Sequence, residues 1–133
     1  MTWMTCLENS GPIEHLFSAP PPLDKVRLHE VVLHRYGPRL SIRFDLGAFP
    51  VSPPKKWVDK GYNTVQITLT FGDIQSLSIS LWSSENIVDI DIGPAHNAVS
   101  LRIMGSGTMI LGEFGFAEVE KVTAYCMDPS ALP

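Results

Sequence analysis

The stretch from Asn63 to Ile92 constrains the fold most strongly, because apolar and polar residues alternate along it in three separate runs. Alternation with a period of two is typical of a strand with one buried and one exposed face. A slip of one residue between neighbouring strands would bring Asp89 and Asp91 into the core, so the pairing is strongly specified. The apolar members of the three runs are Val65, Ile67, Leu69 and Phe71, then Leu77, Ile79 and Leu81, then Val88, Ile90 and Ile92.

The loops between these runs predict which strands pair. Residues 83–86 have the length of a four-residue hairpin loop, and Gly72-Asp73-Ile74 has the length of a three-residue turn. Both loops would place aliphatic side chains opposite one another on the buried face. The sequence therefore predicts a three-stranded antiparallel meander. Its expected pairs include Trp82 with Ile87, Ile79 with Ile90, and Leu69 with Leu77.

Further strands are expected on both sides of this stretch. Upstream, residues 26–36 and 40–46 alternate, and a Gly37-Pro38 turn would set Leu33 opposite Ile42, with glycine supplying the positive φ of a type II′ turn. Downstream, strand-like runs cover residues 99–103, 109–111 and 114–125. The last run places Phe114 and Glu118 on one face unless a β-bulge intervenes.

The complete pattern predicts an all-β fold, a single-domain antiparallel meander of about seven to eight strands. A curved sheet, a partly closed barrel and a sandwich all fit it. Ser10 as an N-cap and Pro12 in the first turn predict at most one short N-terminal helix. One domain over residues 1–133 is expected for this length, with residues 1–9 as an ordered or flexible arm and residues 126–133 as a frayed tail.

Residues 47–62 form a long connection that is too apolar to be left in water. It contains Phe49, Val51 and Trp57 beside three lysines. Trp57 is expected to pack back on the edge of the sheet, while Lys56 and its neighbours stay solvated.

Charge is distributed unevenly along the chain. Residues 25–60 carry eight basic and three acidic groups, whereas residues 61–133 carry two basic and eight acidic groups. This distribution argues against a general nucleic-acid binder and suits a basic partner for the second half of the chain. No apolar stretch approaches the roughly 20 residues that a membrane span needs, and no export signal is visible, so a cytoplasmic location is expected. Free Cys6 and Cys126 are favoured over a disulfide.

No constellation of residues in the sequence indicates catalysis or metal binding, so neither a cofactor nor a metal is expected. His29 and His34 are five residues apart in a strand, where they should point to opposite faces, and they do not match the spacing of a zinc-protease helix. Asp89 and Asp91 share a strand face, but a solvated face is favoured over an acid–base pair.

Trp82, Ile87, Asp89 and Asp91 all belong to the outward face in the expected register. An aromatic residue beside carboxylates is typical of a protein-binding patch. The alternative is that a loop or the N-terminal arm covers Trp82. These four residues are the candidate partner-binding site.

The segment LSIRFDLGAFPVSPPKKW, together with Asn63, Val65, Gln66 and Leu69 and the pair Leu81-Trp82, resembles the immunity protein 50 family of bacterial polymorphic-toxin systems. The resemblance covers roughly residues 10 to 125, and its most specific part runs from Arg43 to Trp57. It implies a small cytoplasmic protein that binds and neutralises a toxin and uses no catalytic motif. A small ligand- or carbohydrate-binding β module is the alternative. The oligomeric state stays open, with a monomer favoured.

Overall fold

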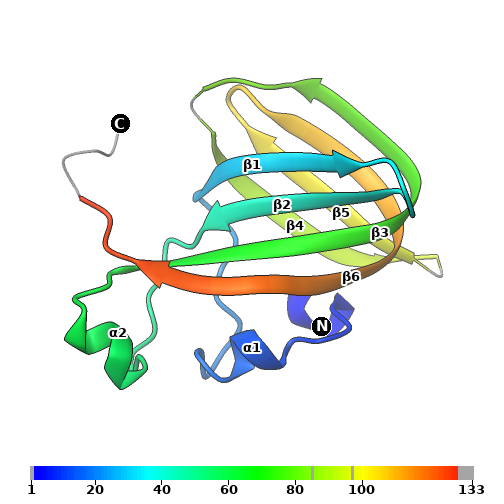
Figure 1. Ribbon diagram of the computed structural model, residues 1–133. Helices are drawn as coiled ribbons and strands as arrows, with labels where there is room; N and C mark the ends of the chain where they lie inside the picture. Colours follow the sequence, from blue (N-terminus) through cyan, green and yellow to red (C-terminus); the bar gives the residue numbers. More distant parts are fainter. Residues whose placement is uncertain (1, 85, 97, 129–133) are drawn as a thin grey trace.

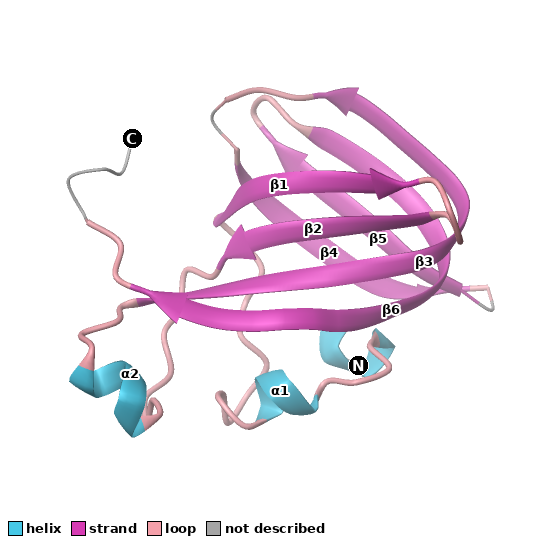
Figure 2. Ribbon diagram, in the orientation of Figure 1, coloured by secondary structure: helices cyan, strands magenta, loops and turns pink. Residues whose placement is uncertain are grey.

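The computed structural model describes residues 2–84, 86–96 and 98–128 (Figure 1). Strands dominate these residues, and the helical segments among them are short (Figure 2). In chain order the elements are the 3₁₀-helix η1 (Trp3–Cys6), α1 (Gly11–Glu14), β1 (Val26–His34), β2 (Arg39–Asp45), α2 (Lys55–Asp59), β3 (Thr64–Leu81), β4 (Ile87–Ala95), β5 (Ala98–Gly105) and β6 (Met109–Tyr125).

In the described part of the chain, six antiparallel strands form a barrel that closes in the order β1-β2-β3-β6-β5-β4 (Figure 1). Two meanders, β1-β2-β3 and β4-β5-β6, are joined by pairing between their long last strands, β3 and β6. The second join, between β1 and β4, is short. It consists of Val26 opposite Val88 and Arg27 opposite Ile87. The all-β prediction is confirmed.

The prediction of a hairpin turn at Gly72-Asp73-Ile74 is wrong, because the chain bends there without reversing its direction. β3 continues from Thr64 to Leu81, and Asp73 takes a φ of +54° at the bend. A Cβ on Gly72 would lie 2.1 Å from the ring of Phe116 on β6, so glycine lets that ring cover the backbone. Leu69 consequently pairs with Val119 on β6 instead of with Leu77.

β6 is likewise continuous where two separate strands were expected. These two mergers, in β3 and in β6, explain why the described residues form six strands and not seven or eight. β6 has a bulge, but it does not lie between Phe114 and Glu118: the register shift between Thr68 and Leu69 leaves Glu120 as the extra residue opposite them.

The expected hairpin between β3 and β4 is also wrong. Ile90 on β4 lies opposite Ile103 on β5, whereas Ile79 on β3 lies opposite Ile110 on β6. Ile87, which was expected opposite Trp82, pairs with Arg27 on β1. The connection after Leu81 therefore crosses from one meander to the other. Its length fitted a hairpin, but β6 offers β3 a partner over its whole length.

The hairpin between β1 and β2 has a wider turn than expected. Leu33 pairs with Leu40 instead of Ile42, which leaves residues 35–38 in the turn. Gly37 takes the expected positive φ, at +58°. A register shift of two residues keeps the side chains of β2 on their predicted faces, so the core assignment of β2 is unaffected.

The N-terminal segment packs against the barrel below β6 (Figure 1). Met4 and Leu7 are buried, and Leu7 forms a parallel bridge with Ala117. The Asn9 amide donates to the Val119 carbonyl at 3.0 Å and accepts the Val119 N–H at 2.7 Å. The predicted short helix is α1, whose Ile13 is fully buried. Of the expected C-terminal tail, residues 126–128 are described and residues 129–133 lie outside the described residues.

The connection between β2 and β3 contains the short helix α2, which the prolines before it had not suggested. Trp57 is half-buried against the core, with its ring centroid 6.2 Å from that of Phe49. Lys55, Lys56 and Lys60 are exposed. The predicted division between a packed tryptophan and solvated lysines is confirmed.

Candidate functional site

Trp82 lies directly after β3 and is 50% exposed. It lines two shallow hollows at the junction of β1, β3 and β4. The first hollow is shared with Arg27, Leu28 and His29 of β1 and with Ile87 of β4, and the second with Val31, Leu33 and Ile79. No loop covers this tryptophan in the described part of the chain, so its exposed half can contact a partner.

Asp89 and Asp91 point outward from β4, as predicted, and both are exposed. Asp89 Oδ1 accepts the Lys25 N–H at 2.8 Å, which ties the start of β1 to β4. Asp91 lies opposite Arg102 on β5 and lines a separate hollow with that arginine and Glu113.

All four predicted residues are therefore exposed, but the structure does not gather them around one hollow. Trp82 and Ile87 meet beside β1, whereas Asp91 faces outward over β4 and β5. The separation follows from the corrected pairing, because β3 and β4 do not form the hairpin that would have aligned the four side chains.

A second group of polar residues surrounds Asp45, which sequence reasoning had missed. This carboxylate is 3% exposed although it points to the outer face of β2. His29 Nε2 lies 2.7 Å from Asp45 Oδ2, and Gln66 Nε2 donates to Asp45 Oδ1 at 3.0 Å. The Tyr125 hydroxyl also donates to Asp45 Oδ2. The four side chains come from β1, β2, β3 and β6, so they tie one side of the barrel together.

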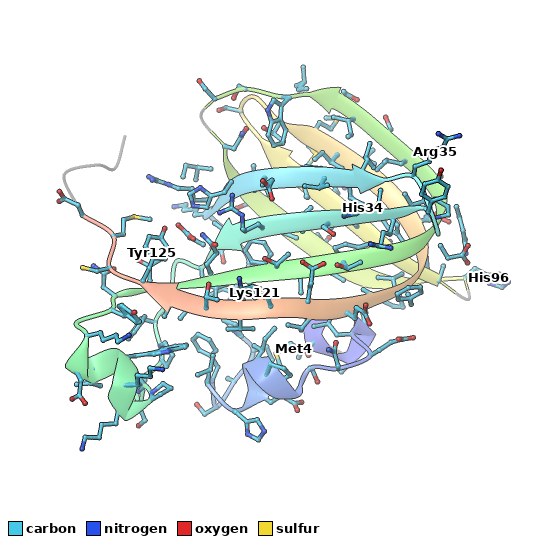
Figure 3. The ribbon with its side chains drawn as sticks, viewed as in Figure 1. Met4, His34, Arg35, His96, Lys121 and Tyr125 are labelled. Atoms are coloured by element: carbon cyan, nitrogen blue, oxygen red, sulfur yellow. The ribbon has the colours of Figure 1, made fainter. Side chains whose placement is uncertain are left out.

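Tyr125 lies at the C-terminal end of β6 (Figure 3). Burial, the hydrogen bond to Asp45 and the negative charge of that carboxylate raise the pKa of Tyr125 to about 12. The positive charges of Arg27 and Arg43 oppose this rise in the pKa. Tyr125 thus remains a neutral hydrogen-bond donor at physiological pH.

A smaller chain of polar contacts lies further along the same outer face. Ser41 Oγ lies 3.4 Å from His34 Nε2 and 3.2 Å from Thr70 Oγ1, and Thr70 donates to Glu120 at 2.9 Å. His34 and His29 thus both contact outward residues of β2. The expectation that they point to opposite faces is wrong, because the register shifts at His29 and moves it to the outer face.

Neither polar group forms a metal site. Among the described residues, no three His, Cys, Asp or Glu side chains are placed to hold a metal ion. His96 lies at the far end of β4 and away from His34 (Figure 3). Both carboxylate oxygens of Asp45 form hydrogen bonds with side chains of neighbouring strands. This cluster therefore stabilises the barrel. Cys6 and Cys126 are free thiols.

The comparisons with known proteins decide the family. The model of the family described as immunity protein 50 matches residues 9–125. The chain belongs to the immunity protein 50 family. No curated protein and no solved structure matches the chain significantly.

Membership in the immunity protein 50 family implies a protein partner, a toxin, for this chain. The surfaces that matter for function are then those where apolar side chains are left exposed. Trp82 and Ile87 satisfy this criterion, with 50% and 43% of their surfaces exposed. No helix in the described residues is long and apolar enough to cross a membrane.

Proposed function

We propose that this protein binds a cognate polymorphic toxin in the cytoplasm and neutralises it by steric and electrostatic occlusion. The proposed contact surface contains Trp82, Ile87, Asp89 and Asp91. The observation that carries the proposal is the exposure of Trp82 beside Ile87 in a hollow at the junction of three strands. Exposed aromatic side chains in such hollows supply a large share of the binding energy in protein complexes.

Charge supports the same assignment. Asp89 and Asp91 extend from Ile87 along the outer face of β4, within the half of the chain that carries eight acidic and two basic groups. A toxin that acts on nucleic acid needs a basic cleft to hold phosphates, and an acidic surface would occupy that cleft. Opposite charges would also accelerate association and make it sensitive to salt.

The test is co-expression with the toxin domain encoded beside this gene. Wild type should protect the cells. Trp82→Ala and the double variant Asp89→Lys/Asp91→Lys should lose protection while keeping the strand-dominated circular dichroism of the wild type. Val58→Lys is the matched control, because Val58 is 59% exposed on α2. No protection by wild type would contradict the proposed function for that toxin. Full protection by both folded variants would exclude this contact surface.

A further inference from the structure

Three aliphatic side chains face the barrel interior, yet none of them is fully buried. Val31, Leu33 and Ile79 lie opposite Ile42, Leu40 and Ile110, and all three of these partners are fully buried. Side chains of directly paired residues lie on the same face of a sheet, so all three point inward. Leu33 is nevertheless 56% exposed and Ile79 44% exposed, while Val31 is half-buried. The wall of the barrel is incomplete beside them.

Two strand edges border this incomplete part of the wall. On the side of β1 that faces β4, the described backbone contacts end with the Leu28 N–H donating to the Asn86 carbonyl. On the side of β3 that faces β2, they end with the Ile74 N–H donating to the Pro38 carbonyl. We call the region between residues 29–34 of β1 and residues 75–81 of β3 the seam. A hollow of about 340 Å³, lined by Val31, Leu33, Ile79 and Trp82, lies in it.

The β3 edge of the seam has none of the usual protection against pairing with another chain. Residues 74–84 carry no charged side chain and no proline. Exposed edge strands normally carry lysine, proline or other charged residues, because unpaired N–H and C=O groups recruit foreign strands. This edge is uncharged and exposes Ile79, Leu81 and Trp82. Such an edge is suited to pairing with a strand from a partner.

We propose that the seam receives an extended segment of the toxin, which adds to the free edge of β3 at residues 75–81 as a seventh strand. This inference rests on the proposed function. The segment would alternate apolar and polar residues, and its apolar side chains would cover Leu33, Ile79 and Trp82. A carboxylate near its end at Trp82 would meet Arg27 and His29, which line the adjoining hollow.

A toxin segment is the proposed occupant because membership in the family implies a protein partner. Arg27 and His29, which line the hollow beside Trp82, also favour a segment that carries a carboxylate. A second copy of this chain is the competing occupant, and the oligomeric state of the free protein tests it.

The first arm of the test measures the affinity of purified toxin domain for variants of the full chain. Ile79→Lys and Leu33→Lys should each weaken binding by at least about 30-fold, as hot-spot residues do. The matched control is Val58→Lys: Val58 is 59% exposed on α2, which belongs neither to the seam nor to the proposed contact surface. Binding should be unchanged in this variant. Because all three side chains are exposed, circular dichroism should show folded proteins.

The second arm uses the wild type alone and therefore does not depend on the folding of variants. Amide hydrogen exchange within residues 75–81 should slow at least about tenfold in the toxin complex, because an added strand accepts hydrogen bonds from the free edge. Light scattering on the free protein should show a monomer.

The outcomes separate the two proposals. Absence of any toxin binding by wild type contradicts the proposed function. If wild type binds, unchanged affinity of Ile79→Lys and Leu33→Lys with unchanged exchange in residues 75–81 overturns the seam as the site and leaves the proposed function standing. A dimer that Ile79→Lys converts to a monomer while toxin affinity is kept assigns the seam to a second copy and overturns the inference.

Discussion

Ile79 and Ile110 lie directly opposite each other on β3 and β6, yet Ile110 is fully buried while 44% of Ile79 is exposed. The pair marks the transition from the closed part of the barrel to its open seam. β6 has a neighbour on each side at this point, whereas the outer edge of β3 has none among the described residues.

This difference in burial predicts that truncating Ile110 and Ile79 to alanine lowers the free energy of unfolding by different amounts. Ile110→Ala should lower the free energy of unfolding by about 2–5 kcal/mol, the range for a buried aliphatic side chain. Ile79→Ala should cost clearly less, because solvent already reaches its side chain. Chemical denaturation of both variants measures the difference. Equal losses would mean that the seam is closed in solution.

The bend in β3 predicts a coupled pair of residues. Gly72→Ala should destabilise the protein, because the new Cβ would occupy the space of the Phe116 ring, whose nearest atom lies 2.1 Å from that position. Displacing the ring should cost about 1–3 kcal/mol, as overpacking does. In the double variant Gly72→Ala/Phe116→Ala, the alanine at position 72 should add little to the cost of Phe116→Ala. Strictly additive losses in a double-mutant cycle would contradict the contact.

Trp57 should stabilise the connection between β2 and β3. Its ring is half-buried beside Phe49, so Trp57→Ala should cost roughly 2 kcal/mol, about half of the loss for a fully buried aromatic residue. Lys56→Ala, on the exposed side of the same helix, should leave the thermal midpoint within error. The assignment would be reversed if Lys56→Ala were the more damaging substitution.

Much of the fold could be predicted from local alternation, because alternation reports which face of a strand is buried. The inward positions of β2 and of the first half of β3 are buried as expected, including Ile42, Phe44 and Ile67. Alternation does not report which strand lies alongside. Ile79 shows the same alternation whether its partner is Ile90 or Ile110. The predicted pairing therefore rested on the length of the loop after Leu81, and that length indicated the wrong partner.

The candidate site was predictable in part for the same reason. The exposure of Asp91 follows from the outward face of β4, whereas Trp82 lies beyond the end of β3 and is exposed beside the seam. Their separation depends on the path of the chain after Leu81, which no local pattern records. Asp45 escaped notice because its burial depends on Tyr125, a residue 80 positions later that only the β3–β6 pairing brings close.

Tyr125 gives the last prediction, a dependence of stability on pH. Its pKa is raised from the ordinary 10 to about 12, so the folded protein holds the hydroxyl proton more tightly than the unfolded chain does. The stability that this difference contributes is fully present below pH 10 and is lost as the pH rises through about 12. Tyr125→Phe should remove this contribution, so the stability difference between wild type and the variant should shrink over that interval.

The measurement is chemical denaturation of wild type and Tyr125→Phe at a series of alkaline pH values. Tyr36→Phe is the control, because Tyr36 is 79% exposed in the β1–β2 turn and should follow wild type throughout. Asp45→Asn should lower the pKa of Tyr125 in an ultraviolet titration, because it removes the negative charge that opposes ionisation of the phenol. A stability difference that stays constant from pH 10 to 12 would show that folding does not raise the pKa of Tyr125, and an unchanged titration in Asp45→Asn would show that Asp45 does not contribute to the rise.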